Sequence, residues 1–524
     1  MMESTLPSLF SASIGAAILA TFSTIFYLLF NEVFRYRKCN PHFAGPPGNI
    51  IFGHLRQLQV NAPEAFRWWS KQYGEVFQIQ LGNVPILVVN SAAAAKELFA
   101  HHGHALNSRP VFYTFHKIVA KTAGFTIGTS PISPELKTRR RAAATALNKP
   151  AVVSYAGHLD LETRALVEDI FSAGGQGEEA INPMPLVKRF ALSVILTLNW
   201  GRRITSDDQA LFKEISEVEA GIVSTRSTLE NLQDYIPLLR WNPFPARSQQ
   251  ARDWRRRRDV YLSRLDQELR DRIEAGSYKP CIQANAMLDP SAKLSQQDLH
   301  IISTSMIQGG TGTISGTISW ALAFLSQHPE IQAKALAEIN RHYQDASSLL
   351  SATTASAPEF RDHLPYLHAL AQECLRYFAV LRLSLPRETT QDVVMHGDKV
   401  IPSGSVIFLN AWACNLDPTV HKDPEEFRPE RWIEGPDLPL FTFGLGYRMC
   451  AGSALANREL ELVLLRVLGC FEILPKKLGD AIDVSPWTGS ANVVEGGRFP
   501  REYEVVFRPK DRDELEKALR ECEI

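Results

Sequence analysis

The chain has 524 residues, and 45% of them are hydrophobic, which is enough to bury a large core. Its 56 basic and 57 acidic residues leave a formal net charge of −1, so no overall electrostatic attraction to DNA or RNA is expected. The seven cysteines are scattered and odd in number, which argues against a disulfide framework and is typical of a reducing compartment.

The first predicted element is a long apolar helix near the N-terminus. Residues 6–30 contain no charged side chain, and a stretch of this length spans ~30 Å of hydrocarbon at ~1.5 Å per residue. Arg35, Arg37 and Lys38 follow, and the positive-inside rule places the chain after them in the cytosol. The stretch lacks the basic flank and the small-residue cleavage site of a signal peptide. We therefore expect a retained membrane anchor, with a buried core helix as the alternative.

A proline-rich linker separates this anchor from the rest of the chain. Because Gly45-Pro46-Pro47-Gly48 breaks any helix, residues 1–44 are predicted to form the anchor with its basic flank, and residues 45–524 one globular domain. Amphipathic periodicity over residues 153–275 predicts a mainly α fold with small β-sheets, and Ser91 is expected to cap a short helix. Strands are expected at residues 77–81, 85–90, 393–395, 399–401, 406–409 and 501–508.

Residues 105–130 show little periodicity and are rich in aromatic side chains. They contain Phe112, Tyr113, Phe115 and Phe125. These residues alone leave two roles open, the lining of a pocket and packing at the surface. Two basic clusters, at residues 137–141 and 255–258, are interpreted as solvated faces, which is the usual role of such clusters.

One long apolar helix is predicted over residues 295–327. It contains four glycines, and each glycine inside a helix costs ~0.5–1 kcal/mol relative to alanine. They are Gly309, Gly310, Gly312 and Gly316. Either close approach of a flat ligand or a local opening of the helix would compensate, and a helix crossing with small residues at the contact is the alternative. The hydroxyl of Thr313 is expected to bond back to a carbonyl four residues earlier or to face a ligand.

Three charged residues further along are candidates for a buried network. Glu373 and Arg376 lie three residues apart on a predicted helix, within pairing distance. Arg431 has a planar guanidinium that can complete the network with the same carboxylate. Taken alone, these residues favour the alternative of two unconnected surface clusters. Arg387 is expected either to meet an anionic cofactor or to remain solvated.

The strongest motif is Phe443-Gly444-Leu445-Gly446-Tyr447-Arg448-Met449-Cys450-Ala451-Gly452. It presents one cysteine just before a long apolar helix, where free N–H groups and the helix dipole favour a thiolate. The cysteine has no partner at zinc-binding spacing, so an axial ligand of haem iron fits better than a structural metal site. A buried cysteine in a turn is the alternative.

Together these motifs stand in the order and spacing of the cytochromes P450, and the chain resembles that family over nearly its whole length. The resemblance implies a P450 fold that binds haem b, with Cys450 as the thiolate ligand of the iron. It implies that Glu373, Arg376 and Arg431 form a structural triad. It also implies that Gly309 and Gly310 border the distal face of the haem and that Thr313 serves catalysis there. The cofactor-binding positions it implies are Cys450, Arg448, Arg387, Arg140, Phe443 and Gly446.

Two departures from the family pattern stand out. The family usually has an acidic residue before the threonine of the distal helix, and this chain has Gly312 there. The departure implies that water, Thr313 or a substrate group carries protons instead, or that the chemistry is altered. The family often has a tryptophan four residues before the arginine of the basic cluster, and this chain has Leu136 before Arg140.

The resemblance also implies an activity. Residues 376–387, 410–415 and 454–459 are similar to fungal phenylacetate hydroxylases and to related tailoring enzymes of natural-product pathways, including those that act on phenylalanine-derived diketopiperazines. Gly312 favours a tailoring enzyme of secondary metabolism over a catabolic phenylacetate hydroxylase. Either would be a monooxygenase in the endoplasmic reticulum membrane, using O2 and electrons from NADPH-cytochrome P450 reductase. A reductase-independent isomerase or dehydratase and a non-catalytic haem-binding membrane protein are the remaining alternatives.

That reaction requires an apolar pocket for a small aromatic or peptide-derived substrate. Its wall is predicted to contain Val380, Leu381, Leu383, Ser384, Phe112, Phe115 and Phe125.

Overall fold

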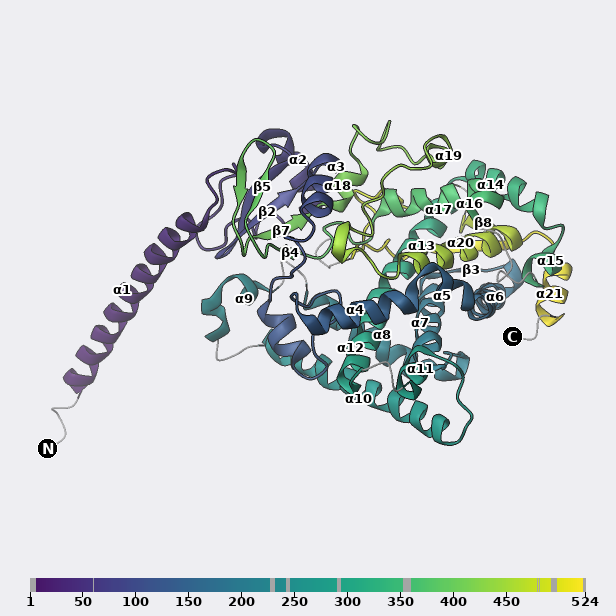
Figure 1. The fold of residues 1–524 in the computed structure, drawn as a ribbon, viewed down its shortest axis with the longest axis horizontal. Coiled ribbons are helices and arrows are strands. Elements are labelled where there is room, and N and C mark those ends of the chain that lie inside the picture. Colours follow the sequence, from purple (N-terminus) through teal and green to yellow (C-terminus); the bar gives the residue numbers. More distant parts are fainter. Residues whose placement is uncertain are drawn as a thin grey trace.

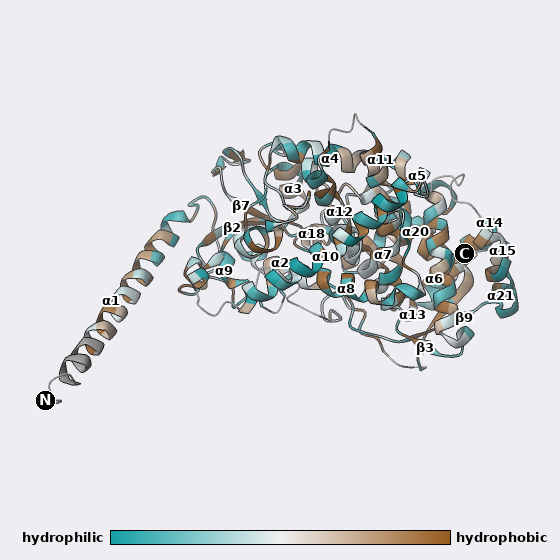
Figure 2. Cartoon of the chain, turned by 90° about the horizontal axis from the view of Figure 1, so that it is seen from below, coloured by the Kyte–Doolittle hydropathy of each residue, from teal (hydrophilic) through white to brown (hydrophobic). Residues whose placement is uncertain are grey.

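The structure is a computed structural model that describes residues 6–59, 61–226, 231–241, 246–289, 294–351, 360–477, 479, 481–491 and 497–521. One long helix, α1 (Leu6–Lys38), projects away from a mainly helical body (Figure 1). A segment of it, Ile14–Lys38, is long and apolar enough to cross a membrane, with a mean hydropathy of 1.7, and little of it is buried. Figure 2 shows apolar residues around this helix, outside the body.

The helices of the body follow the predicted pattern, with two irregular segments. Ser91 caps α3 by accepting a hydrogen bond from the Ala94 N–H at 3.1 Å, as predicted, and a π-helix over Lys96–His101 continues from it. A second π-helix, Tyr113–Ile118, lies in the aromatic segment. The α-helices up to the predicted central helix are α2 (Ala62–Tyr73), α3 (Ala92–Ala95), α4 (Pro134–Leu147), α5 (Lys149–Ser154), α6 (Ala156–Ala173), α7 (Met184–Trp200), α8 (Gln209–Ser224), α9 (Leu232–Tyr235), α10 (Ala246–Glu274) and α11 (Ile282–Leu288).

The predicted central helix is two helices, α12 (Gln296–Gly310) and α13 (Gly312–Ser326), which meet at Thr311. The break confirms the expected local opening among the glycines. The helices after it are α14 (Pro329–His342), α15 (Ala346–Ser351), α16 (Phe360–His363), α17 (Pro365–Phe378), α18 (Ala411–Asn415), α19 (Arg431–Glu434), α20 (Ser453–Cys470) and α21 (Arg512–Glu521).

Three small sheets complete the fold. The largest has the order β1-β2-β7-β4, in which the predicted hairpin of β1 (Val76–Leu81) and β2 (Val84–Val89) is antiparallel. In this sheet β2 pairs in parallel with β7 (Val406–Leu409), and β4 (Arg387–Glu388) pairs antiparallel with β7. The second sheet has the order β3-β9-β8, and β5 pairs with β6 in the third. Their strands are β3 (Ala180–Ile181), β8 (Phe471–Pro475), β9 (Val505–Pro509), β5 (Val393–Met395) and β6 (Lys399–Ile401).

The main core surrounds α13, which is buried from Ile314 to Ser326 because other helices cover it. It packs against α7, α17 and α20. The buried Trp320 of α13 stacks on Phe378 of α17 with ring centroids 4.9 Å apart, which joins the two helices. The six cysteines in the described part of the chain are free thiols, as the scattered pattern predicts. This arrangement brings the cysteine motif, the glycine-rich helix junction and the basic residues into one region.

Candidate active site

The cysteine motif forms a tight loop in front of α20. Gly444 and Gly446 both adopt positive φ, at 70° and 62°, which glycine tolerates and other residues resist. The Cys450 N–H donates to the Phe443 carbonyl at 2.9 Å, and the Met449 N–H donates to the Gly446 carbonyl at 2.9 Å. These bonds fix the loop, so that Cys450 stands three residues before the first residue of α20.

The Cys450 thiol faces an internal space. The residue is exposed, yet burial raises the pKa of its thiol, and the Gly452 N–H and Arg140 act in the opposite direction. Both observations hold for a sulfur that is surrounded by protein but opens onto a space inside it. Binding of a metal ion by the sulfur would favour the thiolate, because a thiol loses its proton when it coordinates a metal.

Four arginines gather at the cysteine loop, each from a different segment. Arg140, on α4, donates from its Nη2 to the carbonyl of Met449 at 3.1 Å. Met449 is the residue directly before the cysteine. Arg387 of β4 donates to the carbonyls of Leu106 and Leu445, at 3.1 and 2.8 Å. Arg448 and Arg109 also bond to main-chain carbonyls. Their acceptors are Asn107, Ile127, Gly128 and Ser130 for Arg448, and Leu385 and Pro386 for Arg109.

This arginine cluster lacks an anion within the described part of the chain. None of the four arginines there pairs with a carboxylate, and the Nε atoms of Arg109 and Arg448 are buried without a hydrogen-bond partner. Burial and the neighbouring guanidinium groups lower the pKa of Arg387 and the pKa of Arg448 to about 9. Buried charges are normally paired, so the cluster requires a negatively charged ligand.

The junction between α12 and α13 offers a second face of the site. A side chain at Gly309 would meet open space, and Gly309 is exposed although the helix lies in the interior. The Thr313 hydroxyl donates to the Gly309 carbonyl at 2.6 Å, which is the first of the two roles expected for it. A side chain at Gly310 would instead lie 2.4 Å from Ile195 of α7. Close helix packing therefore accounts for Gly310, and its predicted place beside the haem stays a prediction.

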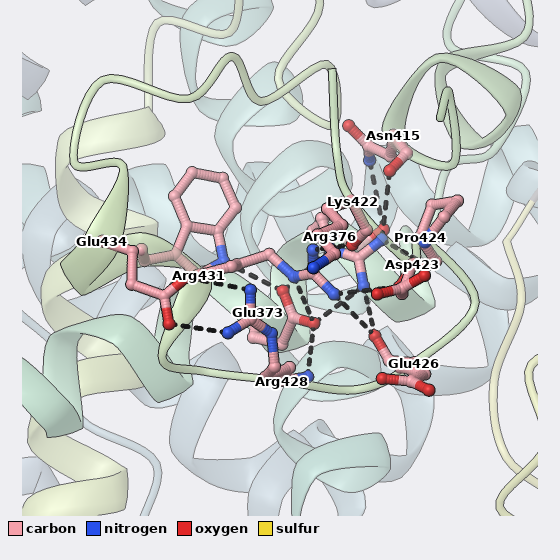
Figure 3. Close-up of polar contacts among 11 residues, drawn as sticks. Glu373, Arg376, Asn415, Lys422, Asp423, Pro424, Glu426, Arg428, Arg431 and Glu434 are labelled. Atoms are coloured by element: carbon pink, nitrogen blue, oxygen red, sulfur yellow. Dashed lines mark hydrogen bonds and ion pairs between the residues drawn. The ribbon is translucent and has the colours of Figure 1, made fainter. Parts of the chain in front are cut away.

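The predicted charged network exists and is buried (Figure 3). Both Glu373 oxygens accept from Arg376, at 2.7 and 2.8 Å, and Arg431 donates to the same carboxylate at 3.1 Å. The Trp432 indole and the Arg428 N–H also donate to it, at 2.9 and 2.8 Å. Burial raises the pKa of Glu373, but these donors outweigh it and the net shift is downward. The alternative of unconnected surface clusters is wrong, because α17 and α19 pack against each other here.

This network supports the cysteine loop through Asn415 and Thr442. Arg376 donates to the Asn415 carbonyl at 3.1 Å. The Asn415 side chain then donates to the Thr442 hydroxyl at 2.9 Å and accepts from the Phe441 N–H at 2.8 Å. The loop that carries Cys450 is thus tied to the buried carboxylate through a chain of short hydrogen bonds.

Comparison with known proteins identifies this arrangement. Residues 43–497 match the family model described as "Cytochrome P450". The chain belongs to the cytochrome P450 family. Among curated relatives, a "3-hydroxyphenylacetate 6-hydroxylase" of Emericella nidulans is 50% identical over 495 residues, covering 94% of each chain. A "Phenylacetate 2-hydroxylase" of the same organism is 38% identical over 490 residues, covering 91% of this chain and 92% of the relative.

Membership makes this protein a haem-thiolate monooxygenase, with O2 and a redox partner as co-reactants. The residues present fit haem. Cys450 offers a sulfur to the iron, and the unpaired arginine cluster offers cations to the two propionates. We propose that Arg448, Arg387 and Arg140, the arginines that the family resemblance implies for cofactor binding, bind the propionates. Despite the departure at Leu136, Arg140 lies beside the cysteine.

Arg109, the fourth member of the arginine cluster, was not predicted from the sequence. Burial, Arg387, Arg448 and Arg140 all lower its pKa, which shows how close the four charges are. Its only local signal is an arginine before Pro110 in a segment without periodicity, and Pro110 holds the preceding residue extended.

Two residues of the predicted pocket wall, Phe112 and Leu383, pack against the hydrophobic cluster around β1 and β2.

Gly446 gives a sharp test of the loop. A side chain at Gly446 would lie 2.0 Å from the Phe99 carbonyl oxygen, whereas one at Gly444 would meet open space. Both positions have positive φ, which alanine resists. Each alanine variant is therefore expected to destabilise the folded state by roughly 1–2 kcal/mol. Only Gly446→Ala also displaces the loop, and we expect it to lower the unfolding midpoint and haem content well below those of Gly444→Ala. Equal effects in thermal unfolding and haem assays would contradict the close approach.

Thr313 gives a test of proton delivery. Its hydroxyl is fixed on the Gly309 carbonyl beside the open space, where Gly312 supplies no acid. We expect Thr313→Ala to divert electrons from product to reduced oxygen species, lowering product per NADPH several-fold. Thr317→Ala, one turn away with its hydroxyl on the Thr313 carbonyl, is the matched control and should keep the coupling. Equal coupling in wild type and Thr313→Ala would remove Thr313 from proton delivery.

Proposed function

We propose that this cytochrome P450 hydroxylates the aromatic ring of an acid of the phenylacetate class. The observation that carries the proposal is the 50% identity, over 94% of both chains, to a relative named for ring hydroxylation of 3-hydroxyphenylacetate. A second relative, at 38% identity, is named for hydroxylation of phenylacetate itself. Both names describe the same change, a hydroxyl added to the ring of an arylacetate.

The arrangement of the site suggests a role for each of its groups in this reaction. Haem supplies the oxygen activation when it is bound. Cys450 would hold the iron and supply electron density to it, and the arginine cluster would hold the propionates. Thr313 and water deliver protons beside Gly309, since Gly312 leaves the usual acid position without a carboxylate. The surrounding helices exclude bulk water, which keeps electrons directed to the substrate.

We further propose that α1 anchors the enzyme in the endoplasmic reticulum membrane. The apolar segment Ile14–Lys38 ends in Arg35, Arg37 and Lys38, and this charge asymmetry favours a cytosolic catalytic domain. NADPH-cytochrome P450 reductase in the same membrane is then the electron donor. A variant without residues 1–38 should move from the membrane pellet to the supernatant and should lose turnover with the membrane-bound reductase more than with a chemical electron donor.

A second candidate is oxidation of a phenylalanine-derived natural-product intermediate, such as a diketopiperazine. Gly312 in place of the acid favours it, because an altered proton supply suits a specialised substrate. Catabolic and biosynthetic substrates differ in one testable property: an arylacetate carries a carboxylate and a diketopiperazine does not.

The experiment supplies purified holoenzyme and reductase with NADPH and each of three substrates: phenylacetate, 3-hydroxyphenylacetate and a cyclic phenylalanine dipeptide. We expect NADPH-dependent ring hydroxylation of an arylacetate, identified by mass spectrometry and NMR. Product from the cyclic dipeptide alone would favour the tailoring role. Product without reductase would favour the isomerase or dehydratase, and an intact haem-thiolate spectrum without any turnover would favour the non-catalytic protein.

A further inference from the structure

Arg226 is a partly buried arginine that contacts the end of α12 next to the helix junction. It lies two residues after the end of α8, and its guanidinium sits 4.2 Å from the centre of the Phe115 ring. Its Nη2 donates to the side-chain oxygen of Gln308 on α12. Gln308 immediately precedes Gly309, the glycine that faces open space. Arg226 therefore joins α8, the aromatic segment and the central helix at the edge of the site.

The charged groups around Arg226 differ in their partners. Arg258 of α10 pairs with Asp259 at 2.7 Å, so the prediction of a solvated face for residues 255–258 is wrong for this buried arginine. One oxygen of the Glu219 carboxyl of α8 accepts from the Tyr261 hydroxyl, and the other is buried without a hydrogen-bond partner. Glu219 is close enough to attract Arg226 electrostatically, but the two side chains form no direct ion pair. Within the described residues, Arg226 forms no ion pair, and its Nε atom is buried without a hydrogen-bond partner.

Burial acts on both Glu219 and Arg226. It raises the pKa of Glu219 above its ordinary value, although the hydrogen bond from Tyr261 and the charges of Arg258 and Arg226 act in the opposite direction. Burial also lowers the pKa of Arg226 to about 10, so the guanidinium keeps its charge at neutral pH. A neutral amide is a poor partner for a desolvated guanidinium, whose planar fork suits two carboxylate oxygens.

We propose that Arg226 binds the carboxylate of the aromatic acid substrate, with Phe115 beneath the guanidinium and the substrate ring directed past Gln308 toward Gly309. The proposal rests on the proposed function and names the group that selects acids over neutral aromatics. Arg226 is a specificity-determining residue here, since it holds the substrate at the end remote from the oxidised ring carbon.

The proposal also gives a reason for Gly312. Gln308 and Gly312 are four residues apart and so lie on neighbouring turns of the same helical face, although the helix opens between them. We infer that a carboxylate at position 312, one turn after the residue that Arg226 contacts, would compete with the substrate or repel it. A side chain there would have room, because its nearest neighbour is Phe499 at 3.8 Å, so packing does not demand a glycine.

The test measures equilibrium binding to the holoenzyme for phenylacetate and for phenylacetamide, its uncharged analogue of the same size. Equilibrium dialysis gives the Kd, and the haem spin-state spectrum gives an independent one. For Arg226→Gln we expect a 10- to 100-fold weaker Kd for phenylacetate, the range for loss of a charged hydrogen bond, and little change for phenylacetamide. Arg226→Lys should recover part of the affinity for the acid.

Gln308→Glu separates binding from a purely structural role. It would give Arg226 a carboxylate partner inside the protein, which favours folding but blocks the substrate carboxylate. We therefore expect an unfolding midpoint at or above that of wild type, together with at least tenfold weaker binding of phenylacetate and unchanged binding of phenylacetamide. Arg240→Gln is the matched control, since Arg240 stacks on Tyr113 of the same aromatic segment but donates to main-chain carbonyls.

Two results with the variants would overturn the proposal, and one with the wild type would do so as well. One is equal weakening of acid and amide in Arg226→Gln, and the other is unchanged acid binding in Gln308→Glu. Failure of the proposed function looks different: wild type would bind aromatic acids in preference to amides yet hydroxylate none of the arylacetates. A wild type that hydroxylates phenylacetate but binds phenylacetamide equally well would leave the activity standing and refute the role of Arg226.

Discussion

Replacing Cys450 with alanine is expected to remove the haem-thiolate Soret band of the reduced carbon monoxide complex and all hydroxylase activity. The sulfur faces the internal space from a loop held by Phe443 and Gly446, and no other thiol among the described residues is exposed. Without it the iron has no anionic protein ligand, so electron density no longer favours O–O cleavage. The spectrum, the haem content and the product yield are measured together.

The matched control is Cys470→Ala, at the buried end of α20. Its thiol behaves as a small apolar side chain, so this variant should keep the band and the activity with only a modest loss of stability. A Cys450→Ala protein that retained both band and turnover would refute the assignment of the axial ligand.

Replacing Glu373 with glutamine is expected to destabilise the fold by about 3–5 kcal/mol, the cost of leaving buried charges without their partner. Two buried arginines, Arg376 and Arg431, share this carboxylate, and its network holds the cysteine loop. We expect a large fall in the unfolding midpoint and loss of haem from the purified protein. Thermal unfolding and haem quantitation measure the two effects.

A surface carboxylate close to this network provides the control. Glu434 is largely exposed and pairs with Arg428 at 2.7 and 3.0 Å (Figure 3). Water screens such a pair, so Glu434→Gln should leave the unfolding midpoint and haem content nearly unchanged. If Glu373→Gln behaved like this control, the network would not support the loop.

The pH dependence of stability follows from the same carboxylate. The donors around Glu373 hold its pKa below the ordinary value in the folded state. Its contribution is therefore complete above the ordinary pKa of glutamate and is lost as the pH falls through the lowered folded value. Wild type should lose stability in acid more steeply than Glu373→Gln, which lacks that titration.

Local sequence patterns were enough to predict the short elements and the cysteine loop. The hairpin, the Ser91 cap and the helix opening depend on neighbouring residues, so periodicity and turn residues reveal them. The charged network joins residues 58 positions apart, and its residues alone favoured the wrong alternative. Only the family resemblance predicted it, because helix packing cannot be deduced from the spacing of charges.

The buried and partly buried arginines that the sequence did not predict were missed for one physical reason. Arg109 and Arg226 are isolated arginines without a motif, and only the fold shows that each is surrounded by protein. Arg258 lies in a run of four arginines, a pattern that predicts a solvated face. In the fold its side chain is buried and pairs with Asp259. A charge count gives the number of cations but not the direction in which each one points.

The arginine cluster around Cys450 also bears on how the protein matures. Before the cofactor arrives, four like charges are confined together, and their mutual repulsion opposes closure of the surrounding segments. Two propionates would relieve that repulsion at the moment of insertion, so part of the folding free energy is deferred until then. Cells short of haem should consequently accumulate little of this enzyme, with the apoprotein cleaved by proteases near residues 105–130 before the distant helices are.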